Sequence, residues 1–355
     1  MEIESQLNNT HQEEEPKTVK KLILILNCAL LSIGNVGGPL ILRLYFFHGG
    51  KRVWLSCWLE TSGFPIMLIP LLISYFYRKS HSKNPTKLFY ITPFLFFSGA
   101  VLGILTGLDD YMYADGVSKL PTSTSALIIA TQLVFTAGFA FLIVKQNITA
   151  FSLNAIVLLT VGAVVLGVHT SSDRPKGESE EAYLSGFFMT LGAAALYGFI
   201  LPMVEWSYKK SKTKVTYTVV VEMQMIMSLF ATVVCTIGML ISNDFQAIPK
   251  EAKSYGLGEG TYYTVLLLNA IIWQLFFLGA IGVIFSASSL LSGIIIAVLL
   301  PLTESLAVAF YHEKFTAEKG ISLALSLWGF VSYFYGEFKQ IKKLKTISKN
   351  TIAEE

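Results

Sequence analysis

Long apolar runs, each of bilayer-spanning length, recur ten times along this 355-residue chain. Only helices can satisfy their own backbone polar groups in so many lipid-embedded segments joined by short connections. Because 53% of the residues are hydrophobic and only 14% are charged, we expect an all-α polytopic membrane protein with ten transmembrane helices. The expected spans are 22–46, 53–77, 88–108, 121–145, 149–169, 183–208, 215–241, 261–285, 288–311 and 317–337.

The distribution of charge predicts the orientation of the chain in the membrane. An even number of spans places both termini on one side. Lysine and arginine outside the spans are about twice as frequent on that side, which the positive-inside rule makes cytosolic. We therefore expect a disordered cytosolic tail over 1–21 and a basic cytosolic tail over 338–355. The net charge of +3 is small and gives no indication of a nucleic-acid partner.

The chain also shows signs of an internal duplication. A shift of 167 residues lays 145–162 over 312–329 with a few identities, including a glycine in each copy. Ten spans divide into five and five, and an odd number of spans per half inverts the second half. The sequence thus predicts two inverted five-helix repeats, 22–169 and 183–337, joined by an extracellular linker over 170–182. This is the arrangement of many secondary transporters.

Helix-breaking residues occur at corresponding places in the first and sixth spans. Interruptions of this kind are tolerated where they line a cavity, although glycine and proline are also common in ordinary membrane helices. We expect functional breaks there, with the ordinary occurrence of glycine and proline in membrane helices as the alternative. The residues concerned are Gly34, Gly37, Gly38 and Pro39 in the first span, and Gly198 and Pro202 in the sixth.

Uncharged polar and aromatic side chains near the middle of the membrane form the candidate binding site. An asparagine or glutamine amide can pair with a flat heterocycle that presents a donor beside an acceptor, and aromatic faces can stack on the same ring. The alternative for each residue is a hydrogen bond between helices. The candidates for contact with a planar, nitrogen-rich ligand are Asn35, Gln132, Tyr197, Trp273 and Gln274.

Two carboxylates, Glu60 and Glu304, lie roughly 10 Å deep, counted by helix rise from the outer ends of their spans. A desolvated carboxyl group holds a proton more readily than one in water, which suits a site that loads and releases protons. We expect Glu304 and Glu60 to be candidates for proton coupling. The alternative is a structural ion pair, for which Arg43 is the available partner of Glu60.

Two further carboxylates, Glu205 and Glu222, lie near the cytosolic ends of the sixth and seventh spans. For these residues we favour the structural interpretation. Lys209 or Lys210 would then pair with Glu205.

Enzyme motifs in the chain are weak. Asp109, Asp110 and Asp115 resemble part of an aspartate-rich metal site, but no second cluster is present to hold a diphosphate, so we interpret them as a solvated helix end. His312-Glu313 lacks the second histidine of a zinc helix. We therefore expect no metal site, no cofactor and no enzymatic activity.

Several longer segments carry a family resemblance. They are NVGGPLILRLYFFHGGKR (35–52), SGFPIMLIPLL (62–72), TGLDDYMYADGVSKLPTSTSALIIATQL (106–133), IIWQLFFLGAIGVIFSASSL (271–290) and LPLTESLAVAFYHEKFTAEKG (300–320). These segments resemble the plant purine permeases, a branch of the drug/metabolite transporter superfamily. The resemblance extends in order from about residue 22 to 338.

The resemblance implies the drug/metabolite transporter fold, with the fifth and tenth spans peripheral and the others around a cavity. It also implies proton-coupled import of adenine, cytokinins and related purine derivatives, commonly at the plasma membrane. The expected partners are thus a purine base or cytokinin, protons and the lipid bilayer. The alternatives are a membrane-embedded enzyme acting on prenylated or lipid substrates, and a cytokinin receptor that does not transport.

Overall fold

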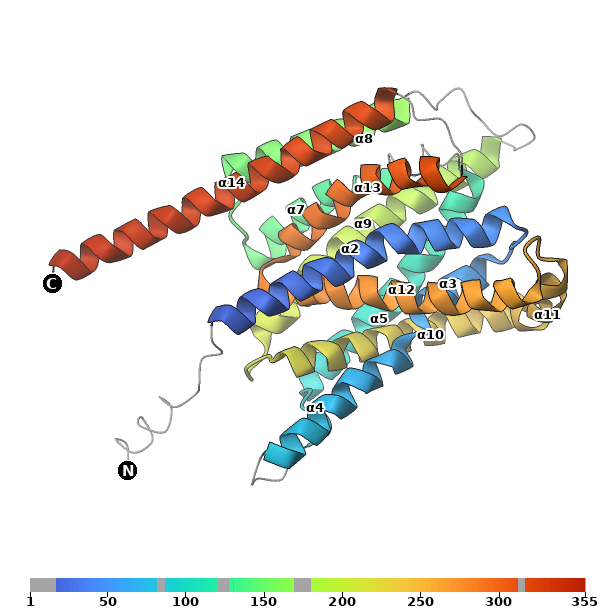
Figure 1. Cartoon of the computed structure of the whole chain (residues 1–355), viewed down its shortest axis with the longest axis horizontal. Coiled ribbons are helices and arrows are strands. Elements are labelled where there is room, and N and C mark those ends of the chain that lie inside the picture. The colour runs from blue at the N-terminus through green and yellow to red at the C-terminus, as the bar shows by residue number, and fades with distance from the viewer. Residues whose placement is uncertain are drawn as a thin grey trace.

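Helices form all the regular structure that the computed structural model describes, and the described part contains no strand (Figure 1). The described residues are 17–81, 87–120, 125, 128–129, 131–168, 180–311 and 317–354. Within them, six segments are long and apolar enough to cross a bilayer, and four shorter helices are also apolar. The chain is therefore an all-α protein with the helices of a polytopic membrane protein.

The six long segments comprise five single helices and one composite. The single helices are α2 (Lys17–Phe47), α5 (Pro93–Lys119), α9 (Glu180–Lys210), α10 (Tyr217–Ile241) and α12 (Glu259–Ser286). The composite consists of α3 (Val53–Thr61), the 3₁₀ turn η1 (Phe64–Met67) and α4 (Leu68–His81). The shorter apolar segments lie in α7 (Gln132–Val144), α8 (Ala150–Val168), α13 (Ser289–Tyr311) and α14 (Ala317–Glu354). One short polar helix, α11 (Asp244–Ser254), was not predicted.

Two helices extend well past their predicted ends: α14, predicted over 317–337, continues to Glu354, and α5, predicted over 88–108, continues to Lys119. Helix α5 begins at a proline directly after Thr92, whose side chain accepts a hydrogen bond from a backbone N–H of the first turn. The prediction ended this span at the first acidic residues, but α5 continues for three more turns. Small residues still face its neighbour there, and Gly116 packs against Thr190 of α9.

The predicted breaks in the first and sixth spans are wrong. Helix α2 continues through Pro39 and α9 continues through Pro202. The interruption lies instead in the second span, at Ser62 and Gly63 between α3 and η1. A Cβ atom on Gly63 would meet the backbone carbonyl of Ala270, so this glycine allows the second span to approach α12 closely.

The glycines of α2 serve close packing against α12. A Cβ atom on Gly34 would overlap the backbone of Phe276, and one on Gly38 would lie 2.9 Å from the ring of Trp273. The two helix axes can approach this closely only where the side chain is a hydrogen atom. These contacts fix the part of α12 that carries the candidate site.

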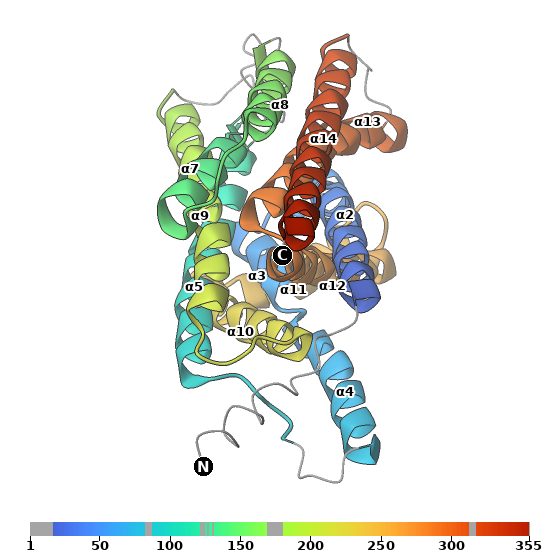
Figure 2. The same cartoon turned by 90° about the vertical axis from the view of Figure 1, so that its left-hand side faces the viewer.

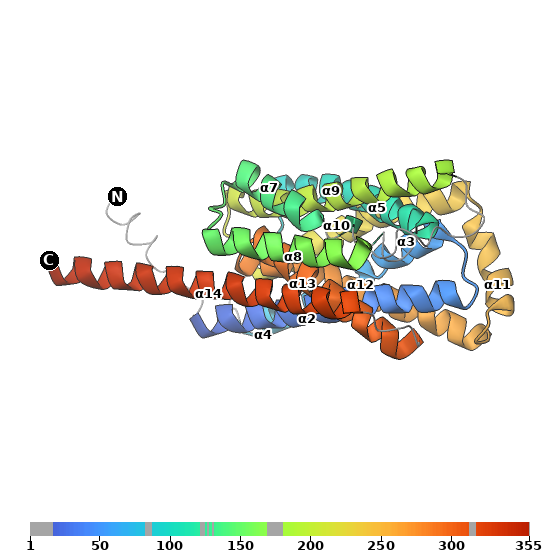
Figure 3. The same cartoon turned by 90° about the horizontal axis from the view of Figure 1, so that it is seen from above.

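Helices α8 and α14 pack along each other at one edge of the molecule, beside the bundle formed by the other helices (Figure 2). The beginning of α2 and the end of α14 lie at the same end of the bundle, and α11 lies at the opposite end (Figure 3). The largest apolar core is formed mainly between α9, α10, α12 and α13.

Candidate functional site

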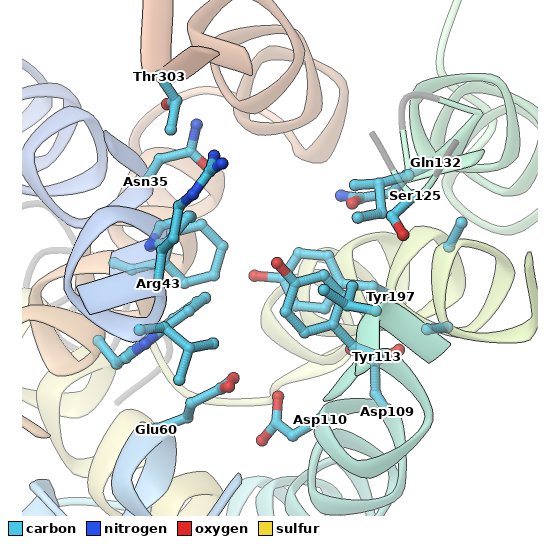
Figure 4. Close-up of a pocket in the computed structure, with 18 of the residues that line it drawn as sticks. Asn35, Arg43, Glu60, Asp109, Asp110, Tyr113, Ser125, Gln132, Tyr197 and Thr303 are labelled. Carbon is cyan, nitrogen blue, oxygen red and sulfur yellow. The ribbon is translucent and has the colours of Figure 1, made fainter. Parts of the chain in front are cut away.

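A cavity of about 590 Å³ lies in the middle of the bundle (Figure 4). Residues of α2, α3, α5, α7, α9, α12 and α13 line it, together with two described residues just before α7. Neither α8 nor α14 contributes to its lining. Lys51 and Ser118, both exposed, lie at the edge of the cavity. They belong to the end of the bundle that carries α11, so the cavity extends toward that end.

Four of the five predicted ligand-contact residues line this cavity, namely Asn35, Gln132, Tyr197 and Trp273. All four are buried. The amide nitrogen of Asn35 donates to the backbone carbonyl of Ile296 on α13 at 3.1 Å, which leaves its amide oxygen as an acceptor for other groups. The cavity therefore brings together polar groups from four helices.

Aromatic rings form one wall of the cavity. The ring of Tyr197 stacks on Phe276, with centroids 6.0 Å apart and an interplanar angle of 24°, and Trp273 meets Phe276 edge to face at 5.3 Å. The indole nitrogen of Trp273 is buried and has no hydrogen-bond partner in the described part of the chain. A wall of this kind offers flat apolar faces together with one unused donor.

Gln274, the fifth predicted contact residue, does not line the cavity. Its amide nitrogen donates to the backbone carbonyls of Glu60 and Thr61 at 3.2 and 3.1 Å, and its oxygen accepts from the Ser228 hydroxyl at 3.2 Å. The last carbonyls of α3 lack partners within the helix because the span breaks after Thr61. Gln274 supplies the missing donor, and it thereby fixes the position of Glu60.

An acidic cluster lines the cavity opposite the amides. It consists of Glu60 on α3 with Asp109 and Asp110 on α5, exposed by only 1%, 6% and 4%. Our interpretation of the two aspartates as a solvated helix end is wrong, because α5 continues past them and carries both into the bundle. Only Asp115, which forms an ion pair with Lys119 at 2.6 Å, lies in the last turns of α5 as expected.

Several cavity residues were not predicted from the sequence. They are Arg43, Lys51, Tyr113, Ser125 and Thr303, in addition to the two aspartates. For α5, one signal was available: glycine recurs at every fourth position from Gly99 to Gly107 and again at Gly116, which continues a packing face beyond the acidic pair. The other residues lack a comparable pattern.

Of the remaining predicted carboxylates, two can be placed. Glu205 forms an ion pair with Lys209 at 2.7 Å, and it accepts a hydrogen bond from the backbone N–H of Ser289 at 2.7 Å. Both oxygens of Glu222 accept from the backbone N–H of Tyr90. The predicted ion pair of Glu205 is confirmed, whereas Glu222 has a structural contact to the backbone. Glu304 belongs to α13, and its side chain lies outside the residues that the structure describes.

Comparison with known proteins identifies the family. Residues 22–343 match a family model described as purine nucleobase transmembrane transport. The chain is 56% identical to Purine permease 3 of Arabidopsis thaliana, over 94% of this chain and 96% of that protein. It is 51% identical to Purine permease 2 of the same plant, over 92% and 95% of the two chains.

One solved crystal structure shares the fold, with a TM-score of 0.55 at 15% sequence identity, over 89% of this chain and 96% of the other. At this identity the likeness extends to the fold alone. The family match over most of the chain, and relatives more than half identical along nearly their whole length, show more: this chain belongs to the plant purine permease family, whose members are transporters and not enzymes.

Proposed function

We propose that this chain imports purine nucleobases and their derivatives, including adenine and cytokinins, together with protons that move down their gradient. The observation that carries the proposal is the central cavity of about 590 Å³, with amides and aromatic rings on its walls and buried carboxyl groups on one side. Its volume lies within the range of about 300–1,000 Å³ that is usual for small-molecule sites. A purine ring therefore fits without displacing a helix.

The polar groups of the cavity match the edge of a purine. The amides of Asn35 and Gln132 each provide an oxygen acceptor, and the indole N–H of Trp273 provides a donor. Adenine presents an amino donor beside a ring-nitrogen acceptor, the pattern that an amide recognises. The Tyr197 and Trp273 rings supply faces for stacking. A site of this kind admits a substituent on the ring, which is what cytokinins require.

Paired helix contacts support the proposed architecture of ten spans in two inverted repeats, 22–169 and 183–337. If α2 corresponds to α9 and α5 to α12, the contact of α2 with α12 has its counterpart in that of α9 with α5. Likewise, α2 with α13 corresponds to α9 with α7, and α8 with α14 pairs the two final spans. Such pairing is what a pseudo-two-fold axis between the halves produces.

Alternating access between the two halves explains how the cavity serves import. The cavity extends toward the α11 end, opposite the beginning of α2 and the end of α14. If both termini are cytosolic at the plasma membrane, this arrangement corresponds to an outward-facing state. Rocking of one repeat against the other would then open the same site to the cytosol.

Proton coupling is proposed for Glu60 and Glu304. Glu60 is almost fully buried, lines the cavity and has one oxygen without a hydrogen-bond partner in the described part of the chain. Carboxyl groups in such places commonly carry protons in transporters. Glu304 is retained as a candidate on its position in the sequence, seven residues from the predicted outer end of its span.

Uptake by a yeast strain that lacks its own purine carriers tests the proposed function. Cells that express the chain should accumulate labelled adenine saturably, and a protonophore should abolish the accumulation, whereas cells with an empty vector should show neither effect. Competition by unlabelled bases and cytokinins then ranks the substrates. Failure of every purine and cytokinin to enter the cells would overturn the proposal, and binding without entry would favour a receptor.

A further inference from the structure

Three carboxyl groups from two helices meet on one side of the cavity. Glu60 interacts electrostatically with both Asp110 and Asp109, and each of the three has one oxygen without a hydrogen-bond partner in the described part of the chain. Figure 4 shows the carboxyl groups of Glu60 and Asp110 directed toward each other, with Asp109 beside Tyr197. We refer to these three residues as the acidic cluster.

Two independent groups indicate that a polar ligand binds in the same cavity as the acidic cluster, and Figure 4 shows one of them, Ser125, beside Gln132 across the cavity from Glu60. The hydroxyl of Ser125 and the indole N–H of Trp273 both line the cavity, and neither has a partner among the described residues. Their residues are only 2% and 7% exposed. Buried donors in native proteins nearly always have an acceptor, so these two are suited to a ligand that enters the cavity.

Ionisation of all three carboxyl groups in this place would be costly, because burial removes water and the like charges repel. Uptake of a proton removes one charge and turns that carboxyl group into a hydrogen-bond donor. The described residues contain no group of acids, histidines and cysteines arranged to hold a metal ion.

The titratable or charged groups that face the cluster are Cys57 on α3, Tyr113 on α5, Tyr197 on α9 and Cys235 on α10, with Arg43 and Lys51 elsewhere along the cavity.

We propose that Glu60, Asp109 and Asp110 together form the proton-binding site of this transporter, and that the protonated cluster donates a hydrogen bond to a ring nitrogen of the bound purine. The inference rests on the proposed function and adds the two aspartates to it. The proton arrives from the outer side, forms an O–H bond on one carboxylate of the cluster and leaves to the cytosol when that bond breaks. No other reactant takes part.

Direct contact between proton and purine explains how their movements are coupled. The ring nitrogens of a purine are acceptors, which a protonated carboxyl group can satisfy and an ionised carboxylate repels. The base therefore binds more tightly to the protonated cluster, and by reciprocity the bound base strengthens proton binding. The two ligands load together and leave together, as symport requires.

Substitution of the cluster separates coupling from binding. In Asp110→Asn the amide is a permanent donor, so purine affinity should no longer fall as the pH rises, and accumulation driven by a pH gradient should drop about tenfold or more, equivalent to at least about 1.4 kcal/mol. Exchange of labelled for unlabelled adenine should remain. Asp110→Glu should restore the pH dependence. Asp115→Asn, a control on the same helix whose side chain pairs with Lys119, should behave like the wild type.

Two results would overturn the inference. One is a normal pH dependence of purine affinity in both Asp110→Asn and Glu60→Gln. The other comes from the wild-type protein in detergent, treated with a hydrophobic carbodiimide, which modifies protonated buried carboxyl groups. Mass spectrometry should find modification at the acidic cluster, with less at high pH and with bound adenine; modification confined to residues outside the cluster would contradict the proposal.

The carbodiimide experiment also remains informative if variants fail to reach the membrane. It also distinguishes a failure of the proposed transport function from a failure of the inference about the acidic cluster. If the protein transports no purine, the proposed function fails, while modification of the cluster that depends on pH would still show that it binds protons. If purines are transported without any modification there, only the inference about the cluster fails.

Discussion

Trp273 and Gln274 are adjacent on α12 but have different surroundings. The indole of Trp273 borders the cavity and has an N–H that no described residue accepts, whereas the amide of Gln274 bonds to the broken end of α3 and to Ser228. Successive residues of a helix point about 100° apart, so one faces the site and the other faces a neighbouring helix. Their roles can be separated by mutation.

Trp273→Phe keeps an aromatic ring and removes only the N–H donor. A neutral hydrogen bond contributes about 0.5–1.5 kcal/mol, so the apparent affinity for adenine should fall by roughly twofold to tenfold with little change in the amount of protein at the membrane. Competition uptake measures the change. Trp328→Phe, at an exposed position of α14, is the control and should have no effect. An unchanged affinity in Trp273→Phe would remove this donor from the site.

Gln274→Ala should destabilise the protein without weakening purine binding directly. The substitution leaves two backbone carbonyls and the Ser228 hydroxyl short of a partner, which costs about 1–3 kcal/mol. Thermal unfolding of the purified protein should show a lower midpoint, and the KM for adenine should stay close to that of the wild type. Asn154→Ala, which removes an exposed contact to Ser332, should change neither. A large rise in KM with normal stability would instead place Gln274 in the site.

The sequence predicted the amide and aromatic residues of the cavity because a polar group deep in an apolar span is conspicuous. Asn35, Gln132, Tyr197 and Trp273 all line the cavity. Orientation around a helix cannot be read from depth alone, which explains the different position of Gln274. Asp109 and Asp110 were missed because clustered acids usually mark a solvated helix end, and only tertiary packing extends α5 beyond them.

Among the elements, the pair of α2 and α12 is the most closely packed part of the site. Glycines of α2 lie directly against the α12 backbone and the Trp273 ring. Between membrane helices such contact depends on van der Waals packing rather than on the hydrophobic effect. The sequence indicated these glycines but not their purpose, since a break and a close contact leave the same pattern.

Gly34→Ala tests that close contact. The Cβ atom of the new alanine would overlap the backbone of Phe276, so α2 and α12 must separate. The free energy of unfolding should fall by about 1–3 kcal/mol, and transport should be reduced. Gly138→Ala on α7 is the matched control, because nothing lies within 4 Å of its Cβ position. That substitution should be neutral or slightly stabilising, since alanine favours a helix. Equal thermal midpoints for the two variants would contradict the packing described here.

At the other end of the bundle, α11 is held by a polar network. Glu251 accepts hydrogen bonds from the hydroxyls of Tyr45 and Tyr262 at 2.5 and 3.0 Å, and Arg52 pairs with Asp244 at 3.3 Å. Burial raises the pKa of Asp244 above its ordinary value, and the Arg52 charge opposes that rise. The network attaches α11 to α2, to α12 and to the loop between α2 and α3.

Arg52→Gln should therefore make the stability of this end depend more strongly on pH. Without the arginine, the pKa of Asp244 in the folded protein rises further. A carboxyl pKa that is higher in the folded than in the unfolded protein means that stability is lost as the pH rises from the unfolded pKa through the folded pKa. The thermal midpoint should be close to that of the wild type near about pH 4 and lower near about pH 7. Lys253→Gln, on the exposed side of α11, should show no such trend. If the thermal midpoint of Arg52→Gln lies below that of the wild type by the same amount at both pH values, this role of Arg52 is contradicted.

On the scale of the whole molecule, hydropathy predicted where apolar helices lie because lipid forces backbone hydrogen bonds into helices. The apolar helices of the structure fall within or overlap the expected runs, and the errors are at ends and breaks. Helix α2 already begins at Lys17, inside the tail that was expected to be disordered, and α14 continues to Glu354 through the expected C-terminal tail. Moreover, α5 is longer, the second span is interrupted and α11 is additional. Those features depend on which helices pack together, which apolar runs do not specify. The cavity, assembled from seven helices far apart in sequence, likewise emerges only in the folded molecule.

The central claim is that one cavity binds a purine and a proton together. Purified protein in liposomes, with labelled adenine outside and an imposed pH gradient, acid outside, measures this directly. We predict accumulation of adenine above its external concentration, which a protonophore collapses and which Asp110→Asn loses while still exchanging adenine across the membrane. If adenine only reaches equal concentrations inside and outside the liposomes, whether or not a pH gradient is imposed, the claim is contradicted.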